Sequence, residues 1–177
     1  AILGGDPEQV MQRLAELDLT AANVNGAGQI VAAGSLDNLA KLAEHAPPRT
    51  RIMKLQVAGA FHTHFMAEAI PALATAAGSL VPRDPRIQIL SNTDGEPVTS
   101  GAEVVDRLIQ QVASPVRWDL CQATLARLDV TGLIELVPGG VLKGLAKRTL
   151  KGVPSVSLTN PDDLIAAREL AQIEAVE

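Results

Sequence analysis

The stretch TAANVNGAGQIVAA, residues 20–33, decides the fold of the first third of the chain. Residues 20–25 and 29–33 are two short strand candidates, and the three residues between them are Gly26-Ala27-Gly28. Two such runs separated by a short connection that contains glycine predict a β-hairpin. The elements on either side can be placed outward from this hairpin.

A helix is expected on each side of the hairpin, with a further strand beyond each helix. Upstream, residues 1–3 form an apolar run, and Asp6-Pro7 supplies an N-cap and a proline at the first helical position. Downstream, Ser35 caps a second helix, and residues 51–57 alternate in the manner of a strand. The order strand-helix-strand-strand-helix-strand predicts an α/β protein with a ferredoxin-like subdomain over residues 1–58.

After residue 58 longer helices alternate with short strands. We expect an Ala-rich helix over residues 63–80, with Pro71 as a kink inside it. Strands that alternate with helices predict a parallel α/β sheet, and three strands would leave that sheet incomplete. We therefore expect a second part over residues 59–177 that needs a partner segment. Its later elements are expected as strands at 87–91, 133–136 and 153–158 and as helices at 104–112, 118–128 and 141–150.

The composition excludes several classes of function. The net charge of −5, with no Tyr, two Phe and one Trp, disfavours nucleic-acid binding, which uses basic surfaces and aromatic stacking. No apolar run reaches the ~18 residues that a membrane-spanning helix needs. The single cysteine, Cys121, cannot form an internal disulfide or a thiolate metal site, and we expect it to be a buried small residue. These features predict a cytoplasmic protein that contacts neither nucleic acid nor membrane.

Three histidines are candidates for chemistry. His45 ends the second helix, where a cation interacts with the helix dipole. A metal site at His62 and His64 is disfavoured, because positions i and i+2 of a helix point about 200° apart and no acid or thiol lies at ligand spacing. His62 is either a capping or core histidine or a base at the mouth of a cleft, kept neutral by the helix N-terminus behind it. No G-x-S-x-G nucleophile motif accompanies it.

Four short motifs follow one another along the chain: NVNGAGQIV at 23–31, GAFHT at 59–63, SPVRW at 114–118 and ELVPGGVL at 135–142. Together they resemble the malonyl-CoA:acyl-carrier-protein transacylases of type II fatty-acid synthesis, close to actinobacterial members, and more distantly the acyltransferase domains of polyketide synthases. The resemblance covers about residues 1–170. It implies that a ferredoxin-like subdomain is inserted in an α/β-hydrolase-like core, which is only partly present in this chain.

The resemblance also implies an activity and its partners. The reaction would move a malonyl group from CoA to the phosphopantetheine thiol of acyl carrier protein through a serine acyl-enzyme. Malonyl-CoA and acyl carrier protein are then the partners, and no cofactor is needed. The nucleophile elbow, the carboxylate-binding arginine and the oxyanion loop would lie upstream of Ala1. We therefore expect the chain alone to be inactive and to require that N-terminal segment of the same enzyme.

Five residues take roles from the resemblance. His62 matches the catalytic histidine, which acts as general base and then acid. Gln111 matches the position whose carbonyl accepts the other ring N–H, which would fix the tautomer without adding a negative charge near the malonyl carboxylate. Phe61 would exclude a substrate with an α-methyl branch, and Asn23 and Asn25 match residues near the acyl cleft. For Gln111, Phe61 and the two asparagines, the alternatives are a helix-end polar residue, a core aromatic and local turn hydrogen bonds, respectively.

Two further questions stay open in the sequence. Four cations within nine residues form a solvated helix face or, less favoured, a docking patch for an acidic carrier or for CoA phosphates. They are Lys143, Lys147, Arg148 and Lys151. The alternative function is a non-enzymatic ferredoxin-like module that binds a small molecule or oligomerises. That module would fold stably without upstream residues, whereas the enzyme hypothesis predicts exposed apolar sheet edges.

Overall fold

The computed structural model describes residues 1–172, and contacts between residues divide the chain into two compact units, Ala1–Cys121 and Gln122–Glu177. Helix α5 (Trp118–Arg127) crosses the division. The division expected at residue 58 stays a prediction. The last five residues of the expected second part, 173–177, lie outside the described part of the chain.

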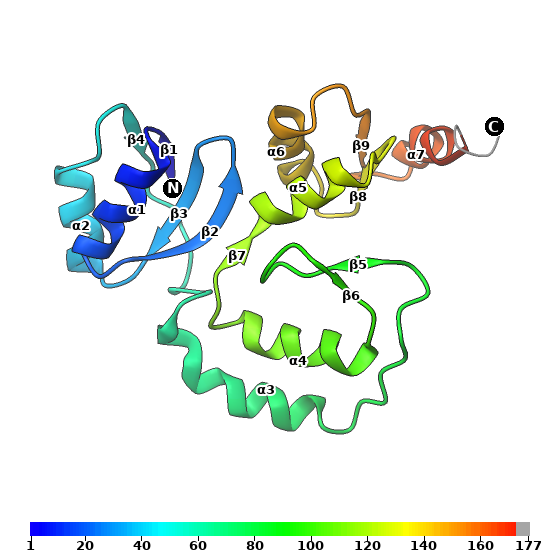
Figure 1. Cartoon of the computed structure of the whole chain (residues 1–177), viewed down its shortest axis with the longest axis horizontal. Coiled ribbons are helices and arrows are strands. Elements are labelled where there is room, and N and C mark those ends of the chain that lie inside the picture. The colour runs from blue at the N-terminus through cyan, green and yellow to red at the C-terminus, as the bar shows by residue number, and fades with distance from the viewer. Residues whose placement is uncertain (173–177) are drawn as a thin grey trace. The chain divides into compact units, whose positions relative to one another are not determined.

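The first unit contains a five-stranded sheet in the order β4-β1-β3-β2-β7 (Figure 1). The first four strands run antiparallel to their neighbours, whereas β7 runs parallel to β2, with Asn23 opposite Val116. The sheet is therefore mixed. Its strands are β1 (Ile2–Gly4), β2 (Thr20–Gly26), β3 (Gln29–Ala33), β4 (Thr50–Ile52) and β7 (Val116–Arg117).

Helices α1 (Pro7–Glu16) and α2 (Leu36–Glu44) begin at the expected caps. The Asp6 carboxylate accepts from the backbone N–H groups of Glu8 and Gln9, and the Ser35 hydroxyl accepts from that of Asn38. Their apolar faces and the sheet share one core of seven buried residues, Ile2, Val10, Leu14, Leu19, Ala21, Ile30 and Leu42. The order of strands and helices expected through the hairpin is confirmed.

Strand β4 is shorter than the expected strand over 51–57. Its partner β1 offers only three paired residues, and the contact extends one residue further, where the Met53 N–H donates to the Ala1 carbonyl oxygen at 2.8 Å. Met53, Leu55 and Val57 follow the strand and are 41%, 41% and 67% exposed. The segment that leads out of the sheet thus presents apolar side chains to solvent.

The single helix expected over residues 63–80 is wrong in detail. A 3₁₀ helix, η1 (His64–Ala69), comes first, and α3 (Ile70–Ala77) follows it. Pro71 lies in the first turn of α3, because proline has no N–H to donate to the preceding turn and is tolerated only at a helix start. The proline therefore separates two helices instead of kinking one.

The strand expected at 87–91 does not join a parallel sheet. Strand β5 (Ile89–Leu90) pairs antiparallel with β6 (Pro97–Val98), because a short turn between them allows only that direction. Helix α4 (Gly101–Gln111) follows, begins at Ser100 and packs beside α3 (Figure 1).

In the second unit, β8 (Leu133–Glu135) pairs parallel with β9 (Ser155–Ser157), as the alternation of elements predicts. Helix α6 (Val141–Thr149) connects the two strands, and α7 (Asp163–Gln172) follows β9. Among residues 1–172, no helix has the length and apolar character needed to span a membrane.

Candidate active site

His62 lies immediately before η1, in a backbone conformation unusual for its residue type. Its φ is +63°, in the left-handed region that residues other than glycine seldom occupy. The His62 backbone N–H donates to the carbonyl oxygen of Val112 at 2.9 Å. Because Val112 ends α4, that helix anchors the residue in this conformation.

The same end of α4 also orients the imidazole ring. His62 Nδ1 lies 2.7 Å from the main-chain carbonyl oxygen of Gln111. A carbonyl oxygen can only accept, so Nδ1 is the donor, and in the neutral ring Nε2 then has the lone pair. The contact thus selects the tautomer in which Nε2 can accept a proton. The structure thus joins His62 and Gln111, although their roles stay predictions.

The side chain of Gln111 acts on a different neighbour. Its Nε2 donates to the carbonyl oxygens of Ser114 at 2.8 Å and Pro115 at 3.1 Å. These bonds fix the turn that leads from α4 into β7, and they hold the Gln111 main chain where its own carbonyl faces His62. Gln111 therefore contacts the His62 ring through its main-chain carbonyl and the Ser114-Pro115 turn through its side-chain amide.

Asn23 is related to this turn through the sheet. It lies on β2 opposite Val116, and Val116 directly follows Pro115. Asn25 lies two residues further along, where the pairing of β2 with β3 shifts register between Val24 and Gly26. The structure therefore places Asn23 beside the turn that orients His62 and places Asn25 in a bulged part of the same strand.

Phe61 precedes His62, and its side chain is 46% exposed. The ring is therefore not part of the core of the described residues, and its role stays a prediction.

The other candidates for chemistry have structural roles. His45 is the C-cap of α2, as its sequence position predicts. His64 stacks on Phe65 with ring centroids 4.2 Å apart. Cys121 is 1% exposed and donates its S–H to the Ser91 carbonyl oxygen at 3.3 Å. Burial, aided by the nearby carboxylates of Asp119 and Asp94, raises the pKa of its thiol to about 11. No group of three or more His, Cys, Asp or Glu side chains within residues 1–172 could hold a metal ion.

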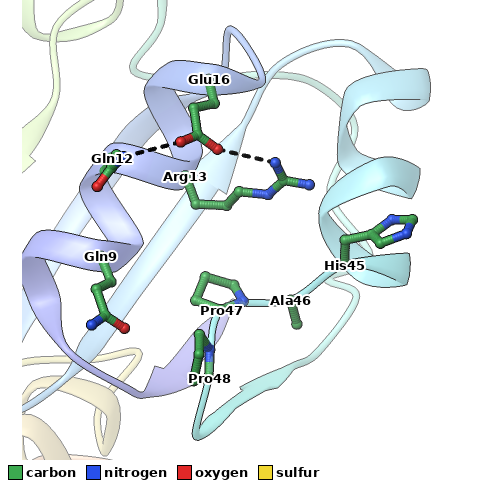
Figure 2. Close-up of a pocket in the computed structure, with 8 residues that line it drawn as sticks. All are labelled: Gln9, Gln12, Arg13, Glu16, His45, Ala46, Pro47 and Pro48. Carbon is green, nitrogen blue, oxygen red and sulfur yellow. Dashed lines mark hydrogen bonds and ion pairs between the residues drawn. The ribbon is translucent and has the colours of Figure 1, made fainter.

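Two surface hollows are lined by other residues. One, of about 290 Å³, lies between α1 and the loop after α2. Figure 2 shows that Gln12 and Arg13 both turn to Glu16 there, so these polar groups satisfy one another. The other, of about 310 Å³, is apolar and lies between α3 and α4. Neither hollow is lined by any of the five candidate residues.

The carboxylate of Glu135 forms a helix cap that the sequence analysis does not predict. Its carboxylate accepts from the backbone N–H groups of Gly140, Leu142 and Lys143, at 2.7, 2.7 and 3.1 Å, and from the Ser157 hydroxyl at 2.9 Å. Partial burial pulls its pKa upward, but these four donors outweigh it and lower the pKa to about 2. The carboxylate thus caps the N-terminus of α6. The signal was present as an acid shortly before Gly139-Gly140 and a helix.

The four cations clustered at residues 143–151 are all exposed. Lys143, Lys147 and Arg148 lie on α6, and Lys147 and Arg148 occupy its last turn, where cations interact favourably with the helix dipole. The solvated helix face that the sequence favours fits this arrangement.

The fold and the candidate site can now be compared with those of known proteins. The chain belongs to the acyl transferase domain family, whose model matches residues 1–164.

The names of individual relatives are more specific than the name of the family. The chain is 53% identical over 164 residues to the malonyl CoA-acyl carrier protein transacylase of Mycobacterium tuberculosis, covering 93% of this chain and 54% of that protein. The crystal structure of the transacylase from that organism superposes with a TM-score of 0.91, covering 97% of this chain and 56% of the other.

A second similar structure is a type II polyketide-synthase acyl carrier protein in complex with its malonyl-transacylase. It has a TM-score of 0.85 and 26% identity, and the match covers 95% of this chain and 56% of that one. The chain spans about half the length of the curated relatives it matches.

Proposed function

We propose that this chain is part of an enzyme that moves a malonyl group from CoA to the phosphopantetheine thiol of an acyl carrier protein through a serine acyl-enzyme. The observation that carries the proposal is the 2.7 Å contact between His62 Nδ1 and the Gln111 carbonyl oxygen in a chain of the acyl transferase family. The substrates come from the names of the relatives, which include a transacylase in complex with its carrier protein.

In the first half-reaction, His62 Nε2 takes the proton of the serine hydroxyl while the oxygen attacks the thioester carbonyl. The tetrahedral intermediate collapses, its C–S bond breaks, and the proton passes from Nε2 to the departing CoA sulfur. In the second, Nε2 accepts the proton of the carrier thiol as the sulfur attacks the acyl-serine ester. The proton then returns to the serine oxygen. The Gln111 carbonyl oxygen, a neutral acceptor, stabilises the transient imidazolium by accepting from Nδ1–H. Malonyl-CoA is the substrate, and the reaction uses no cofactor.

The remaining candidate residues have roles in substrate binding. Phe61, exposed beside the base, excludes an α-methyl branch on the acyl group. Asn23 and Asn25 contribute polar groups from β2 at the edge where β7 pairs. Substrate selection would then come from the residues next to the base and from the adjacent strand.

The finer architecture is also part of the proposal. Residues 1–58 form a ferredoxin-like subdomain, supported by the antiparallel order β4-β1-β3-β2, and residues 59–177 belong to an α/β-hydrolase-like core. The serine is supplied by a segment outside these 177 residues, because the sequence contains no G-x-S-x-G elbow. Exposed apolar residues such as Leu55, Val57 and Leu108 support a covering segment. A cytoplasmic location remains part of this proposal.

Intact mass spectrometry with malonyl-CoA tests the proposal. The 177-residue chain should gain no malonyl adduct, and the complete protein that contains it should gain one. In the complete protein, His62→Ala should lower the rate of transfer to holo carrier protein by about 10²–10⁴-fold. His64→Ala is the matched control, since His64 lies two residues away but stacks on Phe65, and it should stay within about threefold of wild type.

Two results would contradict the proposal: a malonyl adduct on the 177 residues alone, or an unchanged transfer rate in His62→Ala. The alternative, a non-enzymatic binding or oligomerisation module, predicts no adduct in either protein. It also predicts a stable and soluble isolated chain, which circular dichroism and size-exclusion chromatography would detect.

A further inference from the structure

Thr63 directly follows His62, and its hydroxyl group bonds to one residue before the histidine and one after it. Its Oγ1 donates to the main-chain oxygen of Ala60 at 2.6 Å and accepts from the backbone N–H of Phe65 at 3.3 Å. The residue is only 1% exposed, so water is poorly placed to replace these bonds. A single buried hydroxyl therefore closes the turn that contains His62.

This closure bears on His62 because its backbone is held in a sparsely populated conformation. A residue with φ of +63° keeps that conformation only where its surroundings determine it. The end of α4 supplies one restraint, through the Val112 and Gln111 carbonyl oxygens. Thr63 supplies the other from within the turn, since its hydroxyl links Ala60, before His62, to Phe65, after it.

We propose that Thr63 is a positioning residue for acyl transfer. Its hydroxyl fixes the turn of residues 60–63, so that His62 Nδ1 stays on the Gln111 carbonyl and Nε2 faces the reacting atoms. The inference rests on the proposed function. Thr63 does not touch the substrate, and misplacing a base by about 1 Å costs on the order of 10²-fold in rate. Loss of the hydroxyl should therefore lower kcat and leave KM nearly unchanged.

The experiment compares Thr63→Val, which keeps the shape of the side chain but lacks the hydroxyl, with Thr63→Ser, which keeps the hydroxyl. Both are made in the complete protein and assayed for malonyl transfer from malonyl-CoA to holo carrier protein. We expect Thr63→Val to lower kcat by about 10- to 100-fold with KM for malonyl-CoA within about twofold. Thr63→Ser should stay within about threefold of wild type.

Thr124→Val is the matched control for loss of a buried threonine hydroxyl. Thr124 is 4% exposed, its hydroxyl accepts from Arg127, and it belongs to the other compact unit. This variant should keep wild-type kcat. If Thr63→Val does not fold, Thr63→Ala removes the same hydroxyl and is held to the same limits.

A second readout follows the imidazole itself. The ¹⁵N chemical shifts of the His62 ring should report a proton on Nδ1 in wild type and in Thr63→Ser, and a mixture of tautomers in Thr63→Val. Wild-type kcat in a folded Thr63→Val or Thr63→Ala variant would overturn the proposal. So would equal losses in the Val and Ser variants. If His62→Ala is inactive at the same time, the proposed function still stands; an active His62→Ala overturns both.

Discussion

Replacing Glu135 with Gln should loosen helix α6, because the carboxylate accepts three backbone N–H groups at the N-terminus of the helix and the Ser157 hydroxyl. In the variant, an amide NH₂ takes the place of one carboxylate oxygen and faces an N–H donor. The fall of the pKa from 4.5 to about 2 corresponds to about 3 kcal/mol of stabilisation. Because the carboxylate is only partly buried, solvent screening reduces this to about 1–2 kcal/mol.

The sign with pH follows from the lowered pKa. A carboxylate whose folded pKa lies below its unfolded value stabilises the folded state fully above about 4.5, and this contribution is lost as the pH falls toward 2. The advantage of wild type over Glu135→Gln should therefore be complete at pH 6.5, reduced at pH 3, and nearly absent at pH 2.

The stabilisation of α6 by Glu135 can be measured locally from amide hydrogen exchange within the helix, detected by NMR. Protection of residues 145–149 should fall by about tenfold in Glu135→Gln at pH 6.5, which corresponds to about 1.4 kcal/mol. Glu16→Gln is the control, because Glu16 pairs with Arg13 at the surface and should change protection in α1 by less than about twofold. Unchanged protection of α6 at pH 6.5, or a loss that does not depend on pH, would refute the reasoning.

Two further predictions concern the first unit. Native Cys121 should react with iodoacetamide at least about 100-fold more slowly than in urea at pH 8, because it is buried and its thiol pKa is raised to about 11; comparable rates would contradict this. Gly95→Ala should destabilise the protein by about 2–4 kcal/mol in thermal unfolding, since its φ is +73° and a Cβ would overlap the Leu120 main chain. Gly144→Ala, with open space on α6, should be neutral or stabilising, and equal effects at both sites would count against the prediction.

The sequence predicts the first part of the fold well because its signals are local. The hairpin at residues 20–33 and the caps Asp6 and Ser35 each depend on neighbours within a few residues. Strand β7 could not be found this way, since two residues after Ser114-Pro115 form a strand only because β2 is available to pair with them. Pro71 alone does not place the boundary between η1 and α3, because a proline is compatible with a kink or with a helix start.

The candidate site likewise contains some features that the sequence predicts and others that only the structure shows. His62 and Gln111 could be named from motifs, and the structure adds that the carbonyl facing the ring is a main-chain group. The amide of Gln111 and the hydroxyl of Thr63 act on carbonyl oxygens, and sequence patterns do not show where carbonyl oxygens point. For that reason the pairing of His62 with the Gln111 carbonyl could be expected from the sequence, whereas the contacts of the Gln111 amide and the Thr63 hydroxyl could not.

The parallel pairing of β2 with β7 determines when the site can form during folding. The β2–β3 hairpin needs only a short loop and can form within microseconds, whereas Asn23 meets Val116 only after a loop of more than half the chain has closed. Until then the turn of Ser114 and Pro115, which accepts from the Gln111 amide, has no support from β2. If the complete protein opens locally where β7 pairs with β2, the turn of Ser114 and Pro115 loses a support, and we expect the proposed transfer activity to fall before most of the helical signal is lost.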